Sequence, residues 1–416
     1  MSRKVREIVT RFPNLECGFL AGLLAYCERV RRHLEITTGR LLWDFISTAK
    51  KIDSPDEDPE VVYFNVGRGH FDQHGKPENE SLCKLCSLDL IRDSYDFLVG
   101  RPWLRDIFGL VRANDIRGER ISSHPFNLRE LMTALSYNYK DNPQLVLDWL
   151  SLAFCGVFEG CKAGIPIKKI FNPEEMIKGV ALHSPPELEW FEELLQEAIS
   201  TVKRHNSWAQ KAVRAAEVRG RNATVYVPSL KSDIKVIEVF CDSFKTGAAG
   251  RQAGYQIVIQ WNKDGHCQIH GGHIKIEETV DIQTMNVEQF LERTRAGESG
   301  DEIFKTRITK KWAHMGEVAK QLRFLEAKFR GRKIKEGQDW TKSGIIIFAE
   351  NDTPIPWYLA EFLTSLYNGT MSSADIPPTA IGRKKLFEAV CKSLPKCLAV
   401  IQVGSNEREV VGLARV

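Results

Sequence analysis

The chain has 416 residues, of which 43% are hydrophobic, 27% charged and 9% aromatic, and its net charge is only +4. This composition is typical of a globular protein and argues against a disordered chain, while the length predicts at least two domains, each with its own core. No apolar stretch reaches the length that crosses a bilayer, so we expect no membrane partner.

Ten cysteines are ordinary for a chain of this length. Cys83 and Cys86 form a C-x-x-C pair, but apolar residues recur around it at helical spacing and no second pair follows at zinc-binding spacing. We therefore interpret these thiols as buried rather than as half of a zinc site. The apolar run at residues 18 to 26 lacks a cleavage site and predicts a helix face, not an export signal. These features predict a reducing, cytoplasmic location.

The first predicted elements alternate between helix and strand. Residues 18 to 35 predict an amphipathic helix, because apolar side chains recur every three or four positions. An acidic loop at residues 52 to 60 precedes the apolar run VVYFNV, residues 61 to 66, which is typical of a strand buried in a parallel sheet. Gly67 and Gly69 end that strand. We expect an α/β unit whose functional groups collect at the carboxyl ends of its strands.

Helices are predicted for most of residues 82 to 225, and the last one ends in basic residues near Gly220, as the helix dipole prefers. Strand patterns follow, with NKDG as a hairpin turn, at residues 224–227, 234–241, 255–261 and 266–276.

The remaining patterns predict a helix with one basic face, a strand, a turn-rich loop, and a closing helix and strand. The first three lie at residues 316–335, 343–350 and 367–379. We therefore predict an α/β parallel-sheet domain with a helical extension at residues 1–223, a smaller α+β domain at residues 224–416, and a site in the cleft between them.

The segment FDQH, residues 71 to 74, carries the most informative chemistry. It places Asp72 and His74 on the turn after a predicted strand, with Gln73 between them. Two-metal phosphoesterases cluster Asp and His because Mn²⁺ and Mg²⁺ take hard oxygen and imidazole ligands, and a bridging carboxylate holds two cations close enough to activate water. The alternative is that Asp72 and His74 only cap and brace the turn.

Segments along nearly the whole chain resemble the DHH phosphoesterase superfamily, in particular the branch that includes the Myg-type exonucleases. TRFPNLECGFLAGLLAY resembles the first motif of the family, and VYFNVGRGHFDQH resembles its second and third. WLRDIFGLVRANDIRGE resembles the segment that carries the fourth. In the family's order, YQIVIQWNKDGHCQI, LRFLEAKFRGRK and LYNGTMSSADIPPT then resemble its C-terminal strand pair, basic helix, and Asn-Gly-Ser and Pro-Pro-Thr loop.

Several metal-binding positions depart from the family pattern. Where the resemblance implies Asp-x-Asp, this chain has Asn14-x-Glu16. The strand-end Asp is replaced by Asn65 and the middle His by Gln73. Arg11 matches the expected first-motif His, and it cannot bind a cation because it has no lone pair to offer.

Only Asp72, His74 and Asp115 keep the residue types that the resemblance implies for catalysis. With Glu16, these residues are the candidates to hold a single Mn²⁺ or Mg²⁺. The favoured prediction is a metal-free site, because each Asp-to-Asn change removes a charge that would offset a dication.

A Gly-Gly-His sequence lies in the predicted second domain at Gly271, Gly272 and His273. It resembles a phosphate or nucleotide contact of the DHH-associated substrate-binding domain. The alternative is a structural role, because successive side chains of a strand point to opposite faces and do not converge on one ligand.

A strongly basic stretch covers residues 305 to 335, where eleven Lys or Arg face only Glu317 and Glu326. Clustered cations release counterions from nucleic acid, and Trp312 and Phe329 are candidates to stack on bases. A solvated helix face is the alternative. The candidate phosphate-binding residues are Arg323, Lys328, Arg330, Arg332 and Lys333.

Three functions remain open from the sequence. The leading hypothesis is a protein that binds nucleic acid or nucleotides on a DHH scaffold, with hydrolysis weak or lost. The second is an active Mn²⁺- or Mg²⁺-dependent phosphodiesterase or exonuclease, in which Asp72 bridges the metals and His74 positions substrate. The third is a non-catalytic subunit that docks a protein partner.

Overall fold

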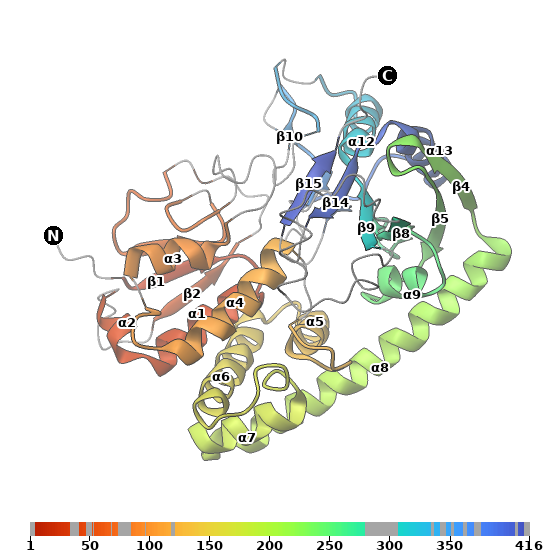
Figure 1. The fold of residues 1–416 in the computed structure, drawn as a ribbon. Coiled ribbons are helices and arrows are strands. Elements are labelled where there is room, and N and C mark those ends of the chain that lie inside the picture. The colour runs from red at the N-terminus through yellow and green to blue at the C-terminus, as the bar shows by residue number, and fades with distance from the viewer. Residues whose placement is uncertain are drawn as a thin grey trace, which may run out of the picture.

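The computed structural model of the chain has a mixed α/β architecture, with helices concentrated in the N-terminal half and most strands in the C-terminal half (Figure 1). The structure describes residues 5–33, 41–46, 52, 54–67, 69–73, 85–95, 97–117, 121–278, 307–333, 337–341, 347–350, 353–360, 364–369, 376–403 and 407–411.

The N-terminal sheet is parallel and, in the described part of the chain, has three strands in the order β2–β1–β3. These strands are β1 (Glu7–Thr10), β2 (Leu42–Phe45) and β3 (Val61–Phe64). Thr10, the last residue of the central strand, pairs with Phe45 on one side and Phe64 on the other. The carboxyl ends of the strands therefore meet at one edge, where the polar groups that follow each strand converge.

Helix α1 (Leu15–Tyr26) follows β1 almost directly and is buried along most of its length. It packs against α6 (Pro143–Lys162) at very close range, since a Cβ on Gly22 would lie 2.6 Å from the Cβ of Phe154. Contrary to the expectation from the sequence, helix α6 is long and apolar enough to cross a membrane, but 67% of its most apolar window is buried inside the protein. That burial is what a core helix of a globular domain shows.

The other helices of the N-terminal half complete the largest hydrophobic core, which draws on residues from Val5 to Val202. They are α2 (Glu28–His33), α3 (Ser87–Tyr95), α4 (Pro102–Arg117), α5 (Leu128–Asn138) and α7 (Pro173–His183).

Helix α8 (Leu188–Arg219) runs from these helices to the first strand of the C-terminal half (Figure 1). A second contact links the same two regions, because the Lys245 ammonium pairs with the Glu130 carboxylate of α5. His205 of α8 is fully buried at this junction. The centroid of its ring lies 4.4 Å from that of the Tyr137 ring and 4.4 Å from that of the Phe244 ring. The junction is thus built from packed aromatic rings and one ion pair.

The C-terminal half contains two larger sheets, counted over the described residues. One has six strands in the order β12–β13–β7–β6–β5–β4 and the other has four in the order β15–β14–β9–β8. The strands of the first are β4 (Asn222–Val227), β5 (Ser232–Phe240), β6 (Ile257–Trp261), β7 (Cys267–Gly271), β12 (Tyr358–Leu359) and β13 (Ser365–Asn368). Those of the second are β8 (Ile274–Glu278), β9 (Arg307–Ala313), β14 (Ala399–Val403) and β15 (Glu407–Val411).

In the described part of this half, helices α9, α12 and α13 and a short strand pair accompany these sheets, and residues from Val227 to Val400 form the second core. The helices are α9 (Thr246–Gln252), α12 (Gly316–Phe329) and α13 (Arg383–Ser393), and the pair consists of β10 (Ile347–Phe348) and β11 (Pro354–Ile355).

The structure confirms the α/β class and several predicted elements. These include the buried parallel strand after the acidic loop, the helical stretch that follows, the NKDG hairpin between β6 and β7, and the closing helix and strand. Strands β1 and β2 and helix α9 were not predicted. The predicted strand at residues 266–276 forms two strands instead of one, because β7 ends before Gly272 and β8 enters a different sheet. The division at residue 223 stays a prediction.

The buried ring of His205 predicts a pH-dependent stability. Burial, followed by the positive charges of Arg204 and Lys245, lowers its pKa from 6.5 to about 4. Between these values the unfolded chain takes up a proton that the buried ring does not, so stability should fall as the pH is lowered. When the pH is lowered from 7.5 to 5, we expect the free energy of unfolding of wild type to fall by about 2 kcal/mol more than that of His205→Phe. Urea unfolding measures both.

An exposed histidine supplies the control for this measurement. His70→Phe should keep the wild-type dependence on pH, because His70 is exposed at the surface. Identical profiles for wild type and His205→Phe would show that His205 does not set this dependence.

Candidate functional site

The candidate site lies at the carboxyl edge of the N-terminal sheet, immediately after β1 and β3. Asn65 follows β3 with a φ of +59°, a left-handed conformation that Asn tolerates better than most side chains. This turn is held by a hydrogen bond from Asn65 N to Phe71 O at 3.1 Å. Asn65 thereby directs its side chain toward the start of α1.

Glu16 is the buried carboxylate of this edge, with 1% of its surface exposed. Its Oε2 accepts a hydrogen bond of 2.6 Å from Asn65 Nδ2, and its Oε1 accepts one of 3.3 Å from Leu88 N. The resemblance implies that Asn14 occupies a metal-binding position. Its side chain instead caps α1, because its oxygen accepts a hydrogen bond of 2.9 Å from Cys17 N. Glu16, one of the buried acids of this edge, therefore accepts hydrogen bonds from two neutral donors.

Arg11 brings a positive charge to the same edge. Burial alone lowers the pKa of its guanidinium, but the carboxylates of Asp115 and then Glu16 reverse this effect and raise the pKa above its ordinary value. Asp115 is half-buried on α4. Three of the residues singled out from the sequence, Arg11, Glu16 and Asp115, are thus brought within electrostatic reach of one another.

The FDQH turn is placed beside them in part. Asp72 is buried, and its backbone N donates to Gly69 O at 3.2 Å. Gln73 is also buried, and its Oε1 accepts a hydrogen bond from the hydroxyl of Ser87, the first residue of α3. His74 lies outside the described residues. Gln73 therefore ties the turn to a neighbouring helix, a role that an amide side chain performs without a metal.

Asp89 is a buried acid that sequence reasoning missed. Its carboxylate accepts from Arg92 Nη1 at 2.8 Å and from Arg112 Nε at 2.8 and 2.9 Å, and it also accepts from Cys86 N. The Asp–Arg spacing of three residues on α3 was the available signal. Cys86 is buried, as predicted, whereas Cys83 lies outside the described residues.

These donors do not fit a two-metal centre. Within the described ranges, no group of three or more His, Cys, Asp or Glu side chains is placed to hold a metal ion. Asn65 and Gln73 contribute neutral amides where the resemblance implies Asp and His, the amide oxygen of Gln73 already accepts from Ser87, and Arg11 adds a positive charge.

The Gly-Gly-His segment lies at the end of β7, and close packing explains why both positions are glycine. A Cβ on Gly271 would lie 2.0 Å from Thr364 O, and one on Gly272 would lie 2.9 Å from Cδ of Arg251. His273 is exposed, with its ring 5.6 Å from that of Trp312. The glycines therefore allow neighbouring chain segments to approach closely.

The predicted basic face on α12 is only partly a surface. Arg323 is fully buried and donates to Trp340 O at 2.6 Å and to Trp357 O at 3.1 Å, and burial lowers its pKa to about 10. This corrects its assignment as a substrate contact. Arg332 is half-buried and donates to Pro354 O at 2.9 Å. These guanidinium groups bind backbone carbonyls inside the protein.

Arg330 also makes an internal contact, in this case with the buried carboxylate of Glu326. Arg330 Nε donates to Glu326 Oε1 at 2.7 Å, while Trp357 Nε1 and Ala380 N donate to the same carboxylate. Asn368, also buried, donates to Pro356 O at 2.6 Å. The Pro-Pro-Thr residues are therefore held to α12, since Thr379 Oγ1 also donates to Glu326, while Asn368 is tied to them by a bond to Pro377 O.

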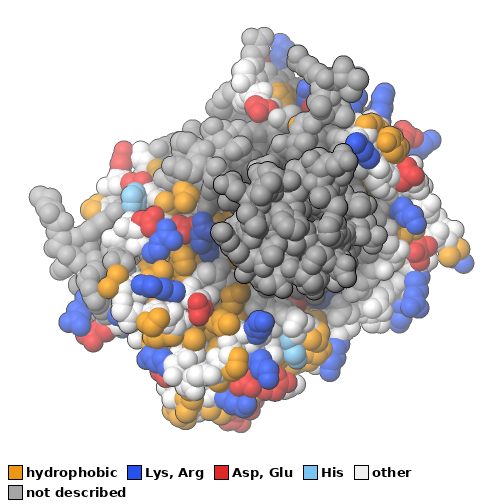
Figure 2. Space-filling model, in the orientation of Figure 1, with side chains coloured by type: hydrophobic (Ala, Val, Ile, Leu, Met, Phe, Trp, Pro, Cys, Tyr) orange, Lys and Arg blue, Asp and Glu red, His pale blue; other side chains and the backbone are white. Residues whose placement is uncertain are grey.

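Another part of α12 is exposed and mixes cations with aromatic rings. Lys320, Phe324 and Lys328 recur at every fourth position, and Phe324 is 52% exposed. Phe329 is 47% exposed, and the ammonium of Lys385 lies 5.1 Å from its ring centroid. We call Lys320, Phe324, Lys328 and Phe329 the α12 stripe. Basic and hydrophobic side chains adjoin one another in this region (Figure 2).

Two aromatic assignments change as a result. Trp312 is buried, with 8% exposed, so the prediction that it stacks on bases is wrong. Phe324 was missed, although its spacing of four residues from two lysines was readable in the sequence. Lys333 is exposed beyond the end of α12.

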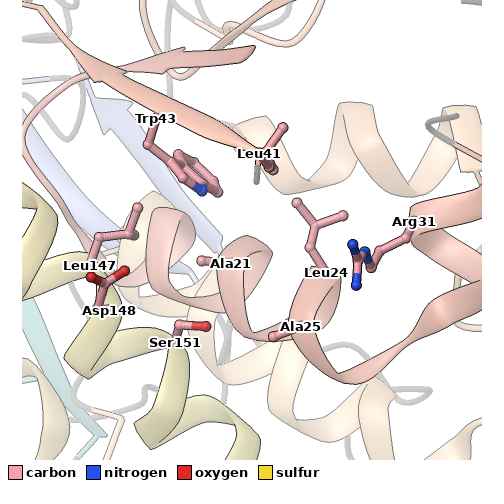
Figure 3. Close-up of a pocket in the computed structure, with 9 residues that line it drawn as sticks. All are labelled: Ala21, Leu24, Ala25, Arg31, Leu41, Trp43, Leu147, Asp148 and Ser151. Carbon is pink, nitrogen blue, oxygen red and sulfur yellow. The ribbon is translucent and has the colours of Figure 1, made fainter. Parts of the chain in front are cut away.

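A separate pocket lies between α1, α2, β2 and α6 (Figure 3). Arg31 and Asp148 lie on opposite sides of it, and the remaining lining is mostly apolar: Ala21, Leu24, Ala25, Leu41, Trp43, Leu147 and Ser151. None of the predicted site residues lines this pocket.

Comparison with known proteins gives no family. No family model and no curated protein matches the chain. A solved structure of an uncharacterized protein from Helicobacter pylori G27 is 12% identical and covers 64% of this chain and 86% of its own. Its TM-score of 0.22 is too low for this likeness to carry any argument about fold or function.

The contact between Asn65 and Glu16 predicts how substitutions at the strand end behave. Asn65→Asp keeps the shape of the side chain but replaces the donor with a second carboxylate. We expect it to lose about 1–3 kcal/mol of stability at pH 7, because a buried hydrogen bond becomes a repulsion between like charges. The loss should shrink as the pH falls, since protonation of one carboxylate restores a donor.

Asn65→Gly is the matched control, because it accepts the φ of +59° and removes only the side chain. Denaturant unfolding of the three proteins at pH 7 and pH 5 makes the comparison. Equal stability of Asn65→Asp and wild type at pH 7 would contradict the contact.

Proposed function

We propose that this chain is a nucleic-acid-binding protein on a DHH-like phosphoesterase scaffold, in which metal-dependent hydrolysis is weak or lost. In this proposal residues 1–223 correspond to the DHH-like domain and residues 224–416 to the substrate-binding domain. The observation that carries it is the α12 stripe, in which Lys320, Phe324 and Lys328 share one exposed helix face and the exposed ring of Phe329 lies at the end of the helix.

The chemistry of the α12 stripe suits a single-stranded ligand. Bases of a single strand expose their faces and stack on aromatic side chains, here Phe324 and Phe329. Lysines at every fourth position, Lys320 and Lys328, supply positive charge for the phosphates that connect those bases.

The strand-end site supports weak or lost hydrolysis. Two-metal catalysis requires anionic ligands that offset two dications and activate water between them. Glu16 is instead engaged by Asn65 and Leu88 N, Gln73 is engaged by Ser87, and Arg11 adds a positive charge. The site keeps the position at the strand ends but offers few anionic oxygens.

Binding is tested by fluorescence anisotropy with a short labelled single-stranded oligonucleotide at several salt concentrations. We expect Lys320→Glu and Lys328→Glu to weaken binding and each to lower the slope of log affinity against log salt by about 0.7. Phe324→Ala should cost about 1–3 kcal/mol and leave the salt slope nearly unchanged, because stacking is not ionic.

Lys168→Glu makes the same change of charge on an exposed loop after α6 and should leave binding as in wild type. If Lys168→Glu weakened binding as much as Lys328→Glu, the affinity would reflect only net charge. Unchanged binding by the lysine and phenylalanine variants would rule out the α12 stripe as the surface.

Hydrolysis is tested with the same oligonucleotide in the presence of Mn²⁺. Wild type and Asp72→Ala should release nucleotides at the same background rate, since few metal ligands remain at the site. Release by wild type that Asp72→Ala abolishes would contradict this prediction and favour an active phosphodiesterase.

A further inference from the structure

The pocket between α1, α2, β2 and α6 has an apolar interior, with a cation on one side and an anion on the other (Figure 3). We infer that it binds a small organic acid with a single carboxylate, whose apolar body fills the interior while its carboxylate bonds to Arg31. The residues of this pocket belong neither to the α12 stripe nor to the strand-end site. The inference therefore does not depend on the function proposed above.

Small side chains on two packed helices leave room for the pocket. Ala21 and Ala25 lie one turn apart on the same side of α1, and Ser151 of α6 lines the pocket with them. Trp43 of β2 forms a further wall, and its indole ring points into the pocket (Figure 3). Helices and a strand thus hold the walls in place, which gives a ligand a preformed site.

The interior suits an apolar group of the size of one ring. Leu24 and Leu147 are buried, with 4% and 1% of their surface exposed, and Leu41 adds a third apolar side chain. The cavity volume is about 190 Å³. Because an apolar cavity of about 150 Å³ accepts benzene, this pocket has room for a ring that carries a short substituent.

Arg31 supplies the charge that a carboxylate requires. It is half-buried on α2, and it lies on the side of the pocket opposite Asp148 (Figure 3). Among the described residues its guanidinium has no ion-pair or hydrogen-bond partner, whereas the neighbouring Arg32 pairs with Glu28 at 3.7 Å. A guanidinium binds a carboxylate through two parallel N–H bonds. An organic acid in the pocket therefore completes the contacts of Arg31.

Asp148 limits the ligand to one negative charge. It is exposed on α6, and its Oδ1 accepts a hydrogen bond of 2.7 Å from Gln144 Nε2. Its carboxylate repels a second anionic group at the end of the ligand that lies away from Arg31. The pocket should therefore prefer a monocarboxylate to a dicarboxylate of the same size.

Isothermal titration calorimetry with p-methylbenzoate tests the inference, and neutral p-methylbenzyl alcohol is the matched ligand. We expect Arg31→Gln to weaken binding of the acid about tenfold and to leave that of the alcohol unchanged, because only the acid pairs with the guanidinium. Arg32→Gln makes the same change of charge outside the pocket and should leave both affinities as in wild type. Equal losses in the two variants, or no binding of the acid to wild type at millimolar concentration, would overturn the inference.

Two further variants test the wall of the pocket and its selectivity. Ala25→Leu fills part of the pocket and should abolish binding of the acid, while α1 should still fold because Ala25 is exposed and Leu is a strong helix former. Asp148→Asn should raise the affinity for terephthalate, a dicarboxylate, by a larger factor than that for p-methylbenzoate. Unchanged binding by Ala25→Leu would overturn the site, and equal gains for the two acids would overturn the role of Asp148.

Discussion

The need to neutralise or hydrogen-bond buried carboxylates governs this structure, and Glu16 shows it most directly. A buried acid is costly unless donors surround it. The short bond from Asn65, the left-handed turn that directs that side chain, and the close placement of α1 against β1 all meet this need. The contacts of this polar edge are therefore arranged around the Glu16 carboxylate.

The same solution recurs elsewhere, with arginine as the usual partner. Asp89 is held by Arg92 and Arg112, and Glu326 by Arg330. Glu238, 3% exposed, pairs with Arg221 and Arg383. Internal use of arginine explains why the basic stretch at residues 305–335 has fewer surface cations than its composition indicates. Its surface charge comes mainly from lysines, whose ammonium groups stay in water.

Strong periodicity made most of the helices and the strand at Val61–Phe64 predictable. Strand β1 was missed because four residues, EIVT, show no period that separates a strand from a loop. The break at Gly272 was missed because an apolar pattern continues across it while the chain changes sheets. Arg323 was misplaced because its charge outweighed its position on the apolar face of α12, beside Leu322 and Glu326.

The resemblance to the DHH motifs placed Glu16, Asn65, Gln73 and Asp115 at one site. It did not predict their contacts, because these depend on how α1, α3 and α4 pack. Arg11 appeared only as a departure from a motif. The most direct measurement is a crystal structure of wild type grown with Mn²⁺ and recorded with anomalous scattering. We expect the amide of Asn65 to remain bonded to Glu16 and no anomalous peak there. Manganese peaks at the ends of β1 and β3 would contradict this account.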